Sequence, residues 1–83
     1  MTISDAYHAD RKLHPEAILL FLVGDYYEAA YVDAERLGVV LGLTVLHSQP
    51  YDNMAIAGFP RHSLYQYANQ LIALGHDVVT IEL

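Results

Sequence analysis

Six consecutive apolar residues, Ile18 to Val23, constrain the fold of this 83-residue chain more than any other stretch. Pro15 precedes this run, and the turn-forming pair Gly24-Asp25 follows it. A short apolar run with turn residues at both ends predicts a β-strand that is buried on both faces. The rest of the chain is therefore expected to serve as scaffold around this strand and the segment that follows it.

An aromatic residue and a carboxylate come directly after the turn. Side chains two positions apart share a face of an extended chain, so Tyr26 and Glu28 are expected to project together. Tyr27 then points the other way and, like Tyr31, is expected to be half-buried packing. The chain thus offers an aromatic ring and an acid side by side at the end of an apolar strand.

Apolar spacing and end signals predict the remaining elements. Three helices are expected, over residues 2–14, 30–42 and 63–75, and further strands over residues 43–47, 54–59 and 77–82. Residues 48–53 are expected to form a turn or short loop. This order predicts one α+β (α/β-like) domain over residues 1–83, with a single mixed β-sheet and about three helices packed on it.

Several residues predict the ends and contacts of these helices. Thr2 or Ser4 is expected to cap the first helix, and Gly42 to end the second. Gly38, inside the second helix, predicts a close packing contact there. Ser63 begins a Ser-x-x-Gln sequence of the capping-box type. The apolar stripe of the third helix is expected to consist of Leu64, Tyr67, Ala68, Leu71 and Leu74.

The charge balance disfavours a tight, free-standing nucleic-acid binder. The chain has 10 acidic and 4 basic residues, a formal net charge of −6. Non-specific DNA affinity depends on lysines and arginines that displace counterions from phosphates. The only such residues are Arg11, Lys12, Arg36 and Arg61. A basic protein partner suits this acidic chain better than nucleic acid does.

The sequence also limits chemistry and location. The chain has no cysteine, which excludes disulfides and thiolate nucleophiles and fits a reducing cytoplasm. No signal peptide is expected from the first residues, and the longest apolar run is too short to span a bilayer as a helix. No metal site and no cofactor are expected, because the histidines form no i,i+4 pair. No spacing points to a nucleophile with its base, so an enzyme is not expected.

Two ordered blocks of sequence resemble a known family. The first block reads His14-Pro-Glu-Ala-Ile-Leu-Leu-Phe-Leu-Val-Gly-Asp-Tyr-Tyr-Glu28, followed by Tyr31, Asp33-Ala34 and Arg36. The second consists of Ala57-Gly-Phe-Pro60, His62, Tyr67, Leu71, Gly75 and Glu82. Together they resemble the N-terminal mismatch-recognition domain (domain I) of the MutS DNA mismatch repair family, here as a small standalone protein. The resemblance covers roughly residues 8–82.

The resemblance implies a non-catalytic module that recognises mismatched duplex DNA. By position, Tyr26 would wedge into the minor groove and stack on the mispaired base, and Glu28 would hydrogen-bond the same base. Possible phosphate contacts are Arg11, Lys12, Arg36 and Arg61. The chain departs from the family in having tyrosine instead of phenylalanine at the wedge. It also has Leu43-Thr-Val-Leu-His47 where the family has a Leu-Thr-Lys-Arg-like run, so two cations are missing.

Three hypotheses follow from these observations. The first is a mismatch-recognition module that binds DNA weakly by itself, because the sequence contains no clamp, lever or ATPase motif. The second is an acidic protein-interaction factor, of mobile-element or phage type, that targets a nucleic-acid enzyme or a repair complex. The third is a structural fragment that works with other domains. A free sheet edge would allow a protein partner or a homo-oligomer. Acids around Tyr26 would favour a protein partner, and clustered cations would favour DNA.

Overall fold

The computed structural model describes residues 2–48 and 54–83, so the turn expected over 48–53 lies, apart from Ser48, outside the described residues. The described elements are α1 (Ile3–Leu13), β1 (Ile18–Val23), β2 (Tyr26–Ala30), α2 (Val32–Leu41), β3 (Leu46–Ser48), β4 (Met54–Pro60), the 3₁₀-helix η1 (Arg61–Ser63), α3 (Leu64–Ala73) and β5 (Val78–Glu82). The strands form one sheet in the order β3-β4-β2-β1-β5. β1 and β5 are parallel, and the other described pairs are antiparallel. The prediction of an α+β fold with one mixed sheet and three helices is confirmed.

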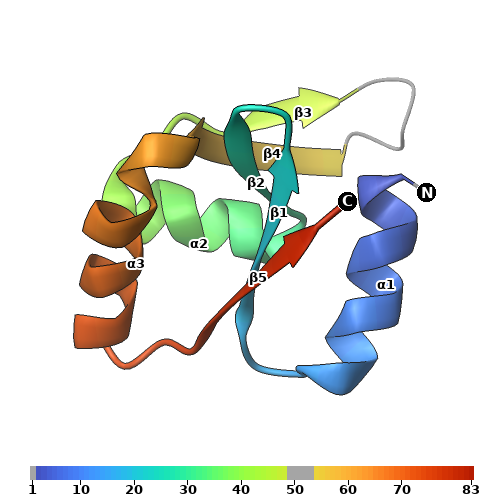
Figure 1. The fold of residues 1–83 in the computed structure, drawn as a ribbon, viewed down its shortest axis with the longest axis horizontal. Helices are drawn as coiled ribbons and strands as arrows, with labels where there is room; N and C mark the ends of the chain where they lie inside the picture. Colours follow the sequence, from blue (N-terminus) through green and yellow to red (C-terminus); the bar gives the residue numbers. More distant parts are fainter. Residues whose placement is uncertain (1, 49–53) are drawn as a thin grey trace.

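Helices cover both faces of the sheet (Figure 1). On one face, Ile18 and Leu20 of β1 pack with Leu37 of α2 and Leu71 of α3. On the other face, Leu19 and Phe21 pack with residues of α1. All four of these β1 residues are fully buried. The prediction of a strand buried on both faces is confirmed for Ile18 to Phe21, whereas Val23 at the end of the run is exposed.

Local end signals place α1 and α2 as expected. Thr2 caps α1: its hydroxyl accepts the N–H of Asp5 at 3.1 Å, and the Asp5 carboxylate accepts the N–H of Thr2 at 3.4 Å. α1 ends one residue before His14, as the following Pro15 requires. At the other end of α2, Gly42 forms the C-cap with a φ of 71°. These expectations are therefore confirmed.

Packing also explains two residues around α2, the glycine Gly38 and the tyrosine Tyr31. A Cβ atom on Gly38 would lie 2.6 Å from the Cγ2 atom of Val45, so the predicted close contact exists. Tyr31 links β2 to α2 with a φ of 56°, and its hydroxyl hydrogen-bonds the Ser4 hydroxyl at 2.9 Å. Its ring packs 4.8 Å from that of Tyr7. Tyr31 is thus the half-buried packing residue that was expected.

Three expectations need correction. Ser63 makes no side-chain cap hydrogen bond with the described residues, because η1 precedes α3 and holds Ser63 at φ −94° and ψ 6° instead of an extended conformation. Leu74 is 64% exposed, since α3 ends at Ala73 and Leu74 lies beyond its apolar stripe. The strand expected over residues 43–47 begins only at Leu46.

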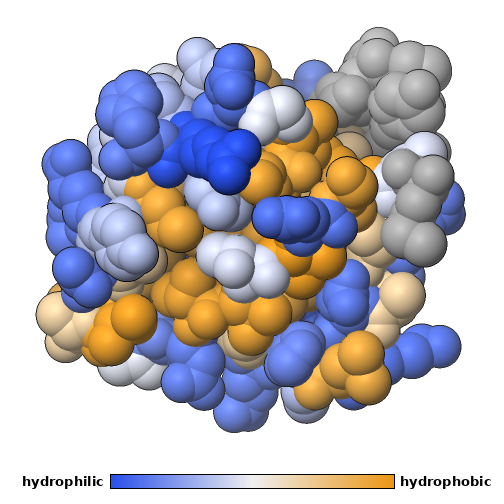
Figure 2. Space-filling model, in the orientation of Figure 1, coloured by the Kyte–Doolittle hydropathy of each residue, from blue (hydrophilic) through white to orange (hydrophobic). Residues whose placement is uncertain are grey.

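The free edge formed by β5 is apolar. β5 is paired with β1 on one side and lies at the end of the strand order, so its other edge is open within the described residues. Figure 2 shows an apolar area in the middle of this side of the molecule, over β5 and its surroundings, framed by hydrophilic residues. An open strand edge was expected from the sequence, and the structure provides one here.

Candidate nucleic-acid interface

A tight hairpin carries the Tyr26 side chain. The two residues Gly24 and Asp25 connect β1 to β2, and Gly24 has a φ of 61°, which glycine adopts readily. Tyr26 is the first residue of β2 and pairs with Val23 of β1 on one side and Pro60 of β4 on the other. Its backbone is therefore held in the sheet, yet 52% of the residue is exposed. This combination gives an aromatic side chain that is in contact with solvent and is carried by a fixed backbone.

Glu28 lies on the same side of the sheet as Tyr26. The two side chains line one surface hollow of about 510 Å³, together with Leu46, Ile56 and other residues of the β3–β4 region. Tyr27 points to the other side, where it packs against the buried Phe59 with the ring centroids 6.0 Å apart. The alternation that the sequence predicted for these three residues is confirmed, as is the packing role of Tyr27.

Gly58 leaves the space that Glu28 needs. Gly58 is the cross-strand partner of Glu28 in the β2–β4 pair. A Cβ atom on Gly58 would lie 2.5 Å from the carbonyl oxygen of Tyr27 and 3.2 Å from the Cγ atom of Glu28. Any larger residue would thus have to displace the strand that carries Tyr26 and Glu28. Sequence reasoning placed this glycine in a motif but assigned it no role, because the pairing of β2 with β4 was unknown.

Asp33 is the one charged residue that is fully buried among those the structure describes. It lies in the first turn of α2, and its Oδ2 atom accepts the N–H of Leu19 at 3.1 Å. The same oxygen pairs with the Arg11 guanidinium. Burial raises the pKa of the Asp33 carboxyl, and the Leu19 N–H and the positive charge of Arg11 oppose that increase. Sequence reasoning missed this role, since nothing local distinguishes Asp33 from the exposed Glu35.

The structure places Arg11 and Arg36 next to Asp33. Arg11 also donates to the carbonyl oxygens of His14 at 3.1 Å and Ala17 at 2.6 Å. The Nη1 atom of Arg36 lies 3.9 Å from the Oδ1 atom of Asp33. These contacts connect α1, α2 and the start of β1 and account for Arg11 as part of an internal ion pair.

Neither arginine lies near Tyr26. Ala17 immediately precedes β1, whereas Val23, the partner of Tyr26, is its last residue. Roughly 20 Å of extended chain separates these two ends of β1. Lys12 is exposed on α1, whose last turn contains Arg11 as well. The structure therefore does not bring the four predicted cations together.

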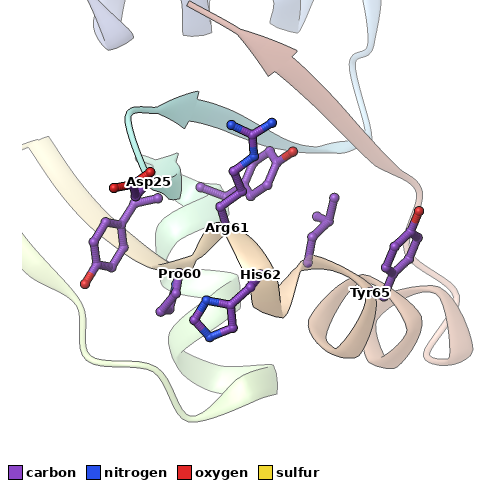
Figure 3. A pocket seen from close by; sticks show the side chains of 8 residues that line it. Asp25, Pro60, Arg61, His62 and Tyr65 are labelled. Atoms are coloured by element: carbon purple, nitrogen blue, oxygen red, sulfur yellow. The ribbon is translucent and has the colours of Figure 1, made fainter.

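Arg61 is the cation beside Tyr26. Its backbone N–H donates to the carbonyl oxygen of Asp25 at 2.7 Å, which ties it to the hairpin turn. Arg61, His62 and Tyr65 line a second hollow that also includes Asp25 and Tyr26 (Figure 3). Around Tyr26 the structure thus places two acids, Asp25 and Glu28, and one arginine. This is neither a ring of acids nor a cluster of cations.

Two further observations concern metals and membranes. Across residues 2–48 and 54–83, no three histidine, aspartate or glutamate side chains gather where they could hold a metal ion. In the same part of the chain, no helix has the length and apolar character needed to cross a membrane.

Comparison with known proteins identifies the family. The family model of MutS domain I matches residues 2–83. The DNA mismatch repair protein MutS of Streptococcus equi subsp. equi (strain 4047) is 42% identical over 74 residues, which cover 87% of this chain and 9% of that protein. MutS of Streptococcus pyogenes serotype M2 (strain MGAS10270) is 40% identical over the same shares. The chain thus spans about 9% of the length of these curated relatives. It belongs to the MutS domain I family.

Proposed function

We propose that this chain recognises mispaired bases in duplex DNA, with Tyr26 as the aromatic residue that enters the base stack and Glu28 as the group that hydrogen-bonds the base. The observation that carries the proposal is the joint presentation of these two side chains. Both line one hollow on the same side of the sheet, and Tyr26 is 52% exposed. The relatives are named DNA mismatch repair proteins, which supports the same assignment.

The proposed recognition is an exchange of stacking contacts. Inserting a side chain between base pairs costs a few kcal/mol of unstacking, and this cost is lowest where the pair is already mismatched. Stacking of a base on an aromatic ring returns about 1–3 kcal/mol. Because pairing on both sides fixes the backbone of Tyr26, the DNA and not the protein has to deform.

Binding should be weak for this chain by itself. The net charge is −6, and Arg11 and Arg36 lie at Asp33, away from Tyr26. Electrostatic attraction to phosphates supplies most non-specific DNA affinity, so little of it is available at the proposed site. We expect an affinity weaker than about 1 µM at about 150 mM salt.

Fluorescence anisotropy tests this function directly. Labelled duplexes with one G·T mismatch and fully paired duplexes are titrated with wild type, Tyr26→Ala and Tyr26→Phe at low salt. Loss of about 1–3 kcal/mol of stacking should weaken mismatch binding by Tyr26→Ala about 5- to 160-fold. Tyr26→Phe keeps the ring and serves as the control that should keep the preference. Equal binding of both duplexes by wild type, or a preference that survives in Tyr26→Ala, would contradict the proposal.

The acidic protein-interaction factor remains the second candidate. It is supported by the net charge of −6 and by Asp25 and Glu28 beside Tyr26. The positive charge of Arg61 argues against this candidate, because Arg61 lines the same hollow as Asp25 and Tyr26. This candidate gains support if the anisotropy titration detects no DNA binding at any salt concentration.

A further inference from the structure

Tyr26 borders two hollows, and the one without Glu28 has no function in the scheme above. This second hollow has a volume of about 780 Å³ and lies between the hairpin turn, η1 and the first turn of α3. Asp25, Arg61, His62 and Tyr65 contribute polar side chains to it (Figure 3). Tyr65 is 82% exposed. Tyr26, Arg61 and Tyr65 thus line the same hollow.

The backbone of Arg61 is held beside that of Tyr26. Pro60 is the cross-strand partner of Tyr26, and Arg61 is the next residue. The 2.7 Å hydrogen bond from the Arg61 N–H to the Asp25 carbonyl closes the same corner from the other strand. Because neighbouring strands lie about 4.8 Å apart, the Arg61 backbone lies within one strand spacing and one residue of the Tyr26 backbone.

Among the described residues, the Arg61 guanidinium has no ion-pair partner, so it can bind an anion. No carboxylate of the described residues lies within ion-pair distance of it, whereas Arg11 and Arg36 are both directed at Asp33. Asp25 shares the hollow but forms no ion pair with Arg61. Arg61 is exposed, and its anchoring bond uses the backbone alone.

We infer that the Arg61–Tyr65 hollow binds the sugar–phosphate backbone of the DNA strand next to the base step that Tyr26 enters, an inference that rests on the proposed function. Arg61 contacts a phosphate, and the Tyr65 hydroxyl donates a second hydrogen bond to the backbone. Arginine and tyrosine both make such contacts, which position a protein on a duplex without reading its sequence. Tyr26 and Glu28 then discriminate the base, while this hollow supplies affinity and orientation.

One phosphate contact has a measurable salt dependence. When the logarithm of the association constant is plotted against the logarithm of the salt concentration, each phosphate contact on B-form DNA makes the negative slope steeper by about 0.9. Removing the Arg61 contact should therefore make the slope less steep by about 0.9. Between 50 mM and 200 mM salt, the ratio of wild-type to Arg61→Ala affinity should shrink by about 3.5-fold. The change should be the same for paired and mismatched duplexes, because a phosphate contact carries no base information.

The test measures these slopes by anisotropy for the full chain. Wild type, Arg61→Ala and Tyr65→Phe are compared with Lys12→Ala, which also removes one exposed cation but from α1. We expect a slope change of about 0.9 for Arg61→Ala and none for Lys12→Ala, with a uniform affinity loss for Tyr65→Phe. Circular dichroism should show unchanged folding, since no described hydrogen bond uses the Arg61 side chain.

The outcomes separate this inference from the proposed function. A slope change for Arg61→Ala on paired DNA, without any mismatch preference in wild type, keeps the backbone contact and rejects mismatch recognition. If wild type prefers the mismatch but Arg61→Ala and wild type have the same salt slope, the backbone contact is rejected and mismatch recognition is kept. Equal slope changes in Arg61→Ala and Lys12→Ala also overturn it, since they indicate diffuse charge instead of a site. Absence of binding at 50 mM salt overturns both.

Discussion

Replacement of Gly58 by alanine tests how closely β2 and β4 approach each other at the candidate site. The added Cβ would lie 2.5 Å from the Tyr27 carbonyl oxygen, an atom of the paired backbone. Favourable separations between non-bonded heavy atoms are about 3.5–4.0 Å, so β2 would have to move by roughly 1 Å. Overpacking of this kind typically destabilises a protein by about 1–3 kcal/mol.

Thermal and urea unfolding followed by far-ultraviolet circular dichroism measure this effect. For a domain of this size, each kcal/mol lowers Tm by about 4–8 °C, so Gly58→Ala should lower Tm by about 4–24 °C. The double variant Glu28→Ala/Gly58→Ala provides the control. Glu28→Ala removes the Cγ contact at 3.2 Å but leaves the backbone clash, so most of the loss should persist.

Two results would refute this reasoning. A Gly58→Ala protein as stable as wild type would show that the two strands separate without penalty. Full recovery in the double variant would show that the Glu28 side chain, not the Tyr27 carbonyl, opposes the added methyl group. In either case the close approach of the β2 and β4 backbones would not be what requires a glycine at position 58.

Two further predictions concern the first half of the chain and the start of α3. Because burial raises the pKa of Asp33 above its usual 3.8, the folded protein binds this proton more readily than the unfolded chain. The stabilisation from the bound proton is complete below about pH 3.8 and is lost as pH rises through the folded-state pKa of Asp33. Urea unfolding should therefore show that wild type gains stability relative to Asp33→Asn as pH falls. A difference between the two proteins that does not depend on pH contradicts this prediction. Thr2→Ala should lower the free energy of unfolding by about 0.5–2 kcal/mol through loss of the cap, whereas Ser63→Ala should change it by less than about 0.5 kcal/mol. Equal losses in the two variants would contradict the assigned caps.

Features that depend on neighbouring residues were predictable from the sequence. The Thr2 cap, the helix stop before Pro15 and the glycine end of α2 each depend on a few adjacent positions. The alternation of Tyr26, Tyr27 and Glu28 depends only on the extended conformation of β2. These parts of the fold and of the candidate site can therefore be predicted without knowledge of any tertiary contact.

Features that depend on distant contacts were not predictable. Ser63 has the local sequence of a capping box, but it is the last residue of η1, which continues directly from the paired end of β4. The space beside Gly58 exists only because β4 pairs with β2. Arg11 was one of four equivalent cations until the structure brought it to Asp33, 22 positions away. The position of Arg61 beside Tyr26 has the same origin.

The strand order has a consequence for how the chain reaches this fold. β1 pairs on one side with β2, which follows it directly, but on the other side with β5, which follows every other element. Long-range pairings of this kind form late, because the intervening chain loses entropy before the contact is made. Until β5 arrives, the most buried strand of the protein has an open, apolar edge. Such edges pair with other molecules as well as with their own chain, so the yield of folded protein should decrease as protein concentration rises.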